Sequence, residues 1–213
     1  MTSNKQPDIS HYSKLRQLRP VSDGMRYSKV LEMFKTCKER VEAIEAIVSL
    51  ELPDCWAAAG VVRNTIWDVL HGTTSWTPLA DIDVAYHDAT ACDIERDTDL
   101  ESRLCSLCGG FRFSVKNQAR MHSRNGHSPY RCSRNALLHW TETCTAVGIT
   151  ISEGNWRVLA PWGVDDLLNL VVRPTFQTRE YIDKVLARVA EKKWLTLWPK
   201  LTIETLGATS NII

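Results

Sequence analysis

The sequence predicts an α/β (α+β) fold in which a small mixed sheet carries helical additions at its N- and C-terminal ends. Segments with apolar residues at helical spacing come first, in the middle and last, and the short segments between them resemble strands. With 213 residues, 44% of them hydrophobic and 24% charged, the chain can bury a core and stay soluble. We expect a loose polar arm over residues 1–24 and a single domain over residues 25–213.

The order of elements follows from apolar periodicity and from turn residues. Segments with helical spacing are expected to be helices: residues 27–50 (one helix or two), 60–72, 93–104, 165–172 and 179–194. Segments rich in β-branched and aromatic residues, or alternating apolar and polar residues, are expected to be strands: residues 80–86, 111–115, 144–151 and 156–159. Glu153-Gly154-Asn155 should join the last two strands as a hairpin. In the helix over residues 93–104, Ile94, Leu100 and Leu104 should face the core.

Asp81-Ile82-Asp83-Val84 is the most informative feature of the chain. Successive side chains of a strand alternate between its faces, so Asp81 and Asp83 should share one face while Ile82 and Val84 enter the core. Two carboxylates held side by side repel each other unless a cation lies between them. Hard oxygen ligands that accept phosphate and water as co-ligands suit Mg²⁺. We therefore assign Asp81 and Asp83 as catalytic residues and metal ligands of a phosphoryl or nucleotidyl transfer site. The alternative is a solvated strand end with two aspartates, which is the usual interpretation of an isolated Asp-x-Asp, and it is the segment upstream of the pair that favours the metal site.

The segment from Trp56 to Gly72 precedes this pair and predicts a helix that begins at Gly60. A glycine lets backbone N–H groups approach a ligand closely, and a helix N-terminus favours phosphate. Arg63 would lie in the first turn, where its guanidinium could bind a phosphate oxygen. The alternative is that Arg63 pairs with a nearby carboxylate and only supports the local structure.

These residues resemble the signature of the polymerase-β-like nucleotidyltransferase superfamily. In its tRNA-CCA-adding and bacterial poly(A)-adding members, Gly-Gly-x-Val-Arg-Asp precedes Asp-x-Asp, whereas here Ala59 replaces the first glycine and Asn64 replaces the aspartate. The chain is more similar to a bacterial nucleotidyltransferase-like family, through further segments at residues 115–122, 160–168 and 193–199. The resemblance spans roughly residues 30–200 and implies a sheet of the nucleotidyltransferase type.

The resemblance implies a nucleoside triphosphate and Mg²⁺ as ligands, with Gly60, Arg63 and Asn64 in the nucleotide-binding segment. Many members of the superfamily carry a third carboxylate on the strand next to the Asp-x-Asp strand. This chain has the neutral Asn117 near that position, flanked by Lys116 and Arg120.

An amide can bind Mg²⁺ or a ribose hydroxyl but cannot act as a general base. We assign Lys116, Asn117 and Arg120 to nucleotide binding; the alternative is a solvated basic face at an ordinary turn. Asp165 or Asp166 could be the missing carboxylate, although two acidic residues at the start of a helix are more typical of capping.

Composition restricts the possible partners and the compartment. A formal charge of +1 gives no overall polycation, so charge alone does not imply long nucleic acids. No apolar run approaches the ~18 residues of a membrane span, and the N-terminus lacks the apolar stretch of a signal peptide. We therefore expect a cytoplasmic protein with no membrane partner.

The seven cysteines are an odd and scattered set, which favours reduced thiols over a disulfide framework. Cys105 and Cys108 have zinc-ligand spacing, and Cys132, His122 or His127 could complete such a site. A second closely spaced pair of ligands is missing, so free cysteines in a loop are the favoured interpretation.

The sequence thus predicts an NTP- and Mg²⁺-binding enzyme that transfers a nucleoside monophosphate to an acceptor hydroxyl of RNA, protein or a small molecule. Two alternatives remain open. One is a catalytically inactive nucleotide-binding or regulatory domain on the same fold, and the weaker one is a zinc-dependent nucleic-acid-binding module.

Overall fold

A five-stranded mixed sheet forms the centre of the computed structural model, which describes residues 23–205. From edge to edge the strands are β3 (Phe113–Asn117), β2 (Ile82–Tyr86), β1 (Trp56–Ala58), β4 (Gly148–Ser152) and β5 (Asn155–Leu159). Strand β1 is antiparallel to both of its neighbours, β4 and β5 form an antiparallel hairpin, and β2 is parallel to β3. A parallel pair needs a crossover, which α5 (Ile94–Leu107) provides.

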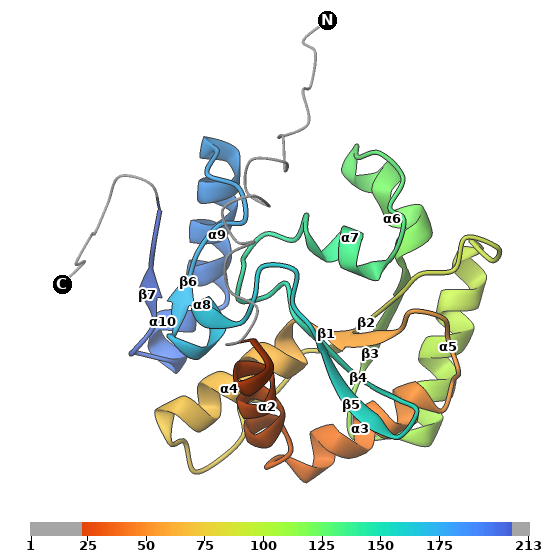
Figure 1. Ribbon diagram of the computed structural model, residues 1–213, viewed down its shortest axis with the longest axis horizontal. Helices are drawn as coiled ribbons and strands as arrows, with labels where there is room; N and C mark the ends of the chain where they lie inside the picture. Colours follow the sequence, from red (N-terminus) through yellow and green to blue (C-terminus); the bar gives the residue numbers. More distant parts are fainter. Residues whose placement is uncertain (1–22, 206–213) are drawn as a thin grey trace, which may run out of the picture.

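The other helices surround this sheet in two groups. They are α2 (Asp23–Phe34), α3 (Lys38–Val48), α4 (Gly60–His71), α6 (Gln118–Asn125), α7 (Ser133–Leu137), α8 (Asp165–Leu168), α9 (Arg179–Glu191) and α10 (Trp194–Leu197). In the view of Figure 1, α2, α3 and α4 lie below the sheet, while α9 and the α6–α7 pair lie above it on opposite sides. A separate two-stranded sheet joins β6 (Val171–Val172) to β7 (Thr202–Ile203).

One face of the central sheet forms the core. Ile82 and Val84 of β2 are fully buried there, together with apolar residues of α3 and α4. The C-terminal segment is fixed to the same core by tryptophans, because Trp194 and Trp198 both pack edge-on against Trp67 of α4 at centroid distances of 5.4 and 5.1 Å. The opposite face of β2 is therefore the one that can carry polar groups.

Most predicted elements are present, and the fold class is confirmed. The segment over residues 27–50 forms parts of two helices, α2 and α3, and the Glu153–Asn155 turn joins β4 to β5 as predicted. The polar arm predicted for residues 1–24 lies outside the described residues, except that Asp23 and Gly24 begin α2. Among the described residues no helix is long and apolar enough to cross a membrane.

Four details of the prediction were wrong. Residues 165–172 are not one helix, because Leu170 adopts a left-handed φ of 60° between α8 and β6. The predicted last helix ends at Glu191, because Lys193 has a φ of 51°. Residues 144–147 precede β4 instead of belonging to it. Ile94 is 63% exposed, so only Leu100 and Leu104 of α5 reach the core.

Candidate functional site

Asp83 lies on the second strand of the sheet, and Asp81 comes immediately before that strand begins. Asp83 is half-buried and Asp81 is exposed, while Ile82 and Val84 are in the core, so the side chains alternate as the sequence predicts. Asp83 pairs in register with Ala58 of β1 and with Ser114 of β3. A central strand with partners on both sides holds this carboxylate in a fixed position.

The surroundings of Asp83 disfavour its charged form. Burial raises the pKa of Asp83 from 3.8 to about 6, and the neighbouring charge of Asp81 adds to this rise. The positive charges of Arg63, Arg188 and Lys192 act in the opposite direction without cancelling it. A divalent cation between the two carboxylates would relieve both the repulsion and the burial penalty, so the residues present fit a metal ligand pair.

Asp83 lies on the wall of a cavity of about 710 Å³. The sheet contributes Asp83 and the adjoining Ala59, α6 and the residues after it contribute one wall, and α9 contributes another. The cavity is lined by Ala59, Asp83, Arg124, Asn125, Gly126, His127, His139, Trp140, Thr141, Glu142, Thr145, Thr178, Glu180, Tyr181, Lys184 and Arg188. In size it matches the pockets that hold small ligands and cofactors.

Glu142 is a cavity residue that the sequence did not single out. Its side chain is fully buried, and Oε1 accepts a 2.7 Å hydrogen bond from Nε of Arg188. The second oxygen, Oε2, is buried with no hydrogen-bond partner. Glu142 therefore brings a carboxylate to the same cavity as Asp83.

The two residues predicted as candidates for a third carboxylate are used elsewhere. Asp165 pairs with Arg26, and Asp166 accepts hydrogen bonds from Thr143 Oγ1 at 2.6 Å and Arg173 Nε at 3.0 Å. Neither lines the cavity. Their positions support contacts between elements and not a role beside Asp83.

The N-terminus of α4 borders the cavity through Ala59. This residue has φ 55° and ψ −118°, a conformation that glycine adopts readily and alanine rarely. Gly60 follows as the first helical residue, and a Cβ added there would meet only Nη2 of Arg63 at 3.8 Å, an ordinary contact. Internal packing therefore does not require glycine at position 60.

Arg63 does not extend into the cavity. It is only 4% exposed, and its guanidinium donates to Thr145 Oγ1 at 2.7 Å and to Asn64 Oδ1 at 3.0 Å. The same group lies 4.3 Å from the ring centroid of Trp194 and 5.2 Å from that of Trp67. In this arrangement the guanidinium of Arg63 contacts Thr145, Asn64 and the two tryptophan rings, and Arg63 is not among the residues that line the cavity.

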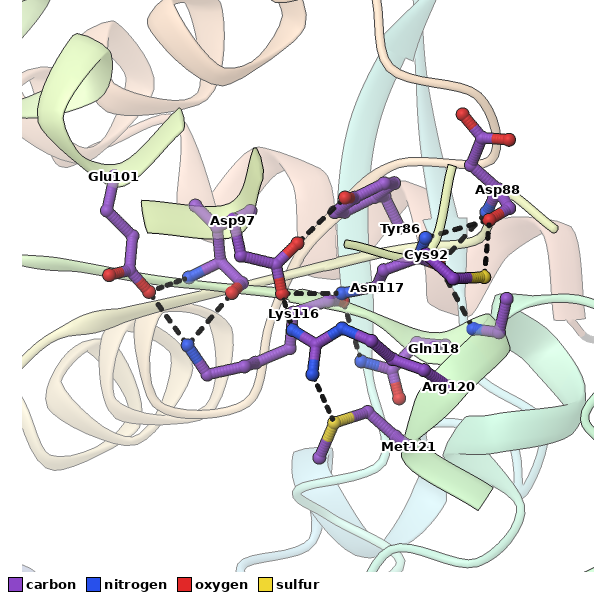
Figure 2. Close-up of polar contacts among 12 residues, drawn as sticks. Tyr86, Asp88, Cys92, Asp97, Glu101, Lys116, Asn117, Gln118, Arg120 and Met121 are labelled. Carbon is purple, nitrogen blue, oxygen red and sulfur yellow. Dashed lines mark hydrogen bonds and ion pairs between the residues drawn. The ribbon is translucent and has the colours of Figure 1, made fainter. Parts of the chain in front are cut away.

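Lys116, Asn117 and Arg120 belong to a polar network between β3, α5 and α6 (Figure 2), and none of the three lines the cavity. Lys116 Nζ binds Glu101 at 2.8 Å, and Arg120 pairs with the buried Asp97. Figure 2 shows Asp97 at the centre of this network, where it also accepts hydrogen bonds from the Tyr86 hydroxyl at 2.7 Å and from the backbone N–H of Asn117 at 3.2 Å.

The Asn117 side chain is also fully used in this network. Its amide donates to the carbonyls of Asp88 and Ala91, and its oxygen caps α6 by accepting from the N–H of Ala119. These three predicted nucleotide-binding residues are thus not brought together with Asp81 and Asp83.

Aromatic side chains from the segments that follow α6 and α7, and from α9, line part of the cavity. The rings of His127 and His139 lie 4.4 Å apart, and Tyr181 of α9 lines the same cavity. Burial lowers the pKa of His139 to about 4, and the neighbouring His127 adds to this effect. His139 is therefore neutral at pH 7, which leaves an uncharged ring surface at this end of the cavity.

The cysteines are free thiols in the described part of the chain. Cys105 is exposed and Cys108 is half-buried. Across residues 23–205, no three His, Cys, Asp or Glu side chains come together in a group that could hold a metal ion. A metal at Asp81 and Asp83 would therefore take its remaining ligands from water and substrate.

Comparison with known proteins shows which family and which solved structures this chain is similar to. The model of a nucleotidyltransferase family matches residues 45–203. A protein whose NMR structure was described as revealing a CCA-adding enzyme head domain is 31% identical, with a TM-score of 0.72 over 84% of this chain and 95% of that chain. A CCA-adding enzyme solved with CTP is 15% identical, with a TM-score of 0.50 over 84% of this chain and 43% of that chain.

The two structural likenesses have different weight. This chain spans nearly the whole of the head-domain protein but less than half of the CCA-adding enzyme, and at 15% identity the second likeness shows the fold alone. The comparison with curated proteins finds no match.

Proposed function

This chain belongs to the nucleotidyltransferase family, and we propose that it is an active nucleotidyl-transfer enzyme that binds a nucleoside triphosphate together with Mg²⁺. In the proposed reaction an acceptor hydroxyl attacks the α-phosphorus, the bond to the bridging oxygen breaks, and pyrophosphate leaves. The acceptor is a hydroxyl of RNA, protein or a small molecule. The family in general uses divalent metal ions, and Mg²⁺ is the specific ion of this proposal.

The observation that carries the proposal is the position of Asp83. Asp83 lies on a strand that is paired on both sides, it lines the cavity, and a second carboxylate is two residues away. Its pKa is also raised. A solvated strand end would not raise the pKa of an aspartate to about 6. Groups whose pKa is shifted by burial and by a like charge are concentrated at functional sites.

Asp81 and Asp83 would hold the metal ion, which supplies charge stabilisation for the phosphate oxygens when it is bound. The N–H groups at the start of α4 are available next to Ala59, and Gly60 leaves space for a ligand to approach them. Binding to these groups orients the nucleotide in the cavity.

The runner-up is a nucleotide-binding domain without transfer activity. Asn64 in place of an aspartate and the lack of a three-ligand cluster among residues 23–205 favour it. The match of the nucleotidyltransferase family model over residues 45–203 favours an active enzyme.

The test is incubation with each of the four α-labelled NTPs, Mg²⁺ and either total RNA, a protein extract or a small-molecule extract. Wild type should transfer label to one acceptor class, and Asp83→Asn should not. Asp99→Asn is the matched control, because Asp99 is an exposed aspartate on α5. Mg²⁺-dependent NTP binding without any transfer would favour the runner-up, and neither binding nor transfer would refute the proposal.

A further inference from the structure

Three cationic side chains line the cavity from two opposite walls. Lys184 and Arg188 lie four residues apart on α9 and therefore on one face of that helix. Arg124 lies in the last turn of α6 and makes no hydrogen bond or ion pair with any of the described residues. The lining also contains three carboxylates, those of Asp83, Glu142 and Glu180, so phosphate binding depends on which cationic donors remain available and not on the net charge of the cavity.

Arg188 is held in a defined orientation by Glu142. The bond from its Nε to Glu142 Oε1 is 2.7 Å long, and Glu142 is fully buried, so the carboxylate cannot follow a moving side chain. Both terminal NH₂ groups of Arg188 are left without a partner in the described part of the chain, and the side chain is 37% exposed. A guanidinium fixed at Nε with free terminal groups is suited to a phosphate.

Lys184 lies one helical turn before Arg188 on the same face of α9. Four residues of helix separate it from Arg188, a rise of about 6 Å. Its Nζ donates to Glu180 at 2.6 Å, but an ammonium has three donors, so further bonds remain available. The side chain is 55% exposed and can move towards a ligand.

The helix α4 cannot supply this charge. Arg63, the arginine of its first turn, is buried against Trp194 and bonded to Thr145. The cations nearest to the open cavity are those of α9 and α6. The positive charge of Arg188 also acts on Asp83, which places it close to the carboxylate pair.

We infer that Arg188 and Lys184 of α9 bind the β- and γ-phosphates of the nucleoside triphosphate, with Arg124 contacting them from the opposite wall. Glu142 acts as a positioning residue for Arg188. This inference rests on the proposed function, since it assigns the phosphate contacts of the same site. It places the α-phosphate at Asp81 and Asp83 and the leaving pyrophosphate along α9.

The experiment compares the affinities of each NTP and of the matching NMP by calorimetry in the presence of Mg²⁺. Lys184→Ala and Arg188→Ala should each weaken NTP binding about 10- to 100-fold, as expected for lost charge-assisted hydrogen bonds. NMP binding should change by less than about threefold, because an NMP lacks the two phosphates concerned. Arg179→Ala is the control, since Arg179 lies on α9, is 88% exposed and does not line the cavity.

Removal of Arg188 leaves Glu142 buried without its partner, so this variant could unfold. The double variant Glu142→Gln with Arg188→Gln avoids the unpaired charge and should show the same loss of NTP affinity. Lys184→Ala is a further safeguard, because Lys184 is 55% exposed and its ion pair is with the exposed Glu180, so its removal leaves no buried charge.

The outcomes separate this inference from the proposed function. If wild type binds an NTP, Asp83→Asn does not, and the Lys184 and Arg188 variants bind as wild type does, the inference is wrong and the proposed function stands. An equal loss of NTP and NMP affinity in a folded variant would also overturn it. A wild-type protein that binds no NTP would refute both.

Discussion

Replacement of Asp83 by asparagine should stabilise the protein while it abolishes metal-dependent nucleotide binding. Asparagine has nearly the shape of the neutral carboxyl group but cannot ionise. Because burial and the charge of Asp81 raise the pKa of Asp83 to about 6, the charged form destabilises the folded state at neutral pH. Asp83→Asn removes that cost.

The magnitude follows from the shift in pKa. The rise from 3.8 to about 6 corresponds to about 3 kcal/mol at a pH above both values, since each pKa unit is worth about 1.4 kcal/mol. Below its unfolded-state pKa, the carboxyl group of Asp83 is neutral in both states and costs no stability. As the pH rises from the unfolded-state pKa to the folded-state pKa, the unfolded state loses the proton more readily, and the folded state is progressively destabilised. The advantage of the variant should therefore be about half as large at pH 5 as at pH 8.

The assay is thermal unfolding with a chelator, at several values of pH between 5 and 8. For a chain of this size, about 3 kcal/mol should raise the Tm of Asp83→Asn by about 6–12 °C at pH 8. Addition of Mg²⁺ should raise the Tm of wild type and leave that of the variant unchanged, because only wild type has both carboxylates. Asp81→Asn should stabilise less, since it removes only the like charge beside Asp83.

Asp99→Asn again controls for the loss of one negative charge from the surface. A Tm of Asp83→Asn that is equal to or below that of wild type at pH 8 would refute the reasoning. So would a stability difference that does not vary with pH, because the argument depends on the titration of this one group.

Three other predictions concern the chemistry around the site. Ala59→Gly should stabilise the protein by about 1 kcal/mol in thermal unfolding, because φ 55° with ψ −118° strains an alanine; an unchanged or lower Tm would contradict this. Gly60→Ala should leave the stability near that of wild type and weaken NTP binding. Arg63→Ala should lower the free energy of unfolding by about 2–4 kcal/mol and change the NTP affinity by less than about threefold, because the Arg63 side chain is buried. A loss of NTP affinity at a constant Tm would instead show that Arg63 binds phosphate. Replacing Cys105 and Cys108 together by serine should change the free energy of unfolding by less than about 0.5 kcal/mol, and stoichiometric zinc in the purified protein with unfolding on chelation would show otherwise.

The parts of the fold that the sequence predicted well are set by local chemistry. Strand β2 and its alternation were predictable because side chains two residues apart share a face. The end of α4 was predictable because Gly72, with φ 66°, takes the left-handed conformation that ends many helices. Two of the boundaries that failed, at Leu170 and Lys193, depend on a left-handed φ at a residue with a side chain, for which the sequence carries no warning.

Of the residues that the sequence assigned to the site, only Asp83 is among those that line the cavity. None of the six residues assigned to nucleotide binding lines the cavity. Asn117 ends the strand next to Asp83 and Arg120 follows it, but Arg120 pairs with Asp97 of α5 and the Asn117 amide bonds the carbonyls of Asp88 and Ala91. These partners cannot be read from local spacing. The row of Lys184, Arg188 and Lys192 at intervals of four was a usable signal, whereas Glu142 lies in a segment with no periodic pattern.

The buried position of Arg63 at the start of α4 and the position of the cationic residues of α9 have a common structural cause. Arg63 points into the core because Trp194, at the start of α10, provides a ring surface for it, and α10 follows directly after α9. The same C-terminal segment therefore holds Arg63 in the core, away from the cavity, and places Arg188 on the cavity wall. Glu142 then fixes the orientation of Arg188 from a position 46 residues earlier in the chain. If α9 binds the leaving phosphates, an arginine of α9 performs the task that the resemblance assigns to the first turn of α4.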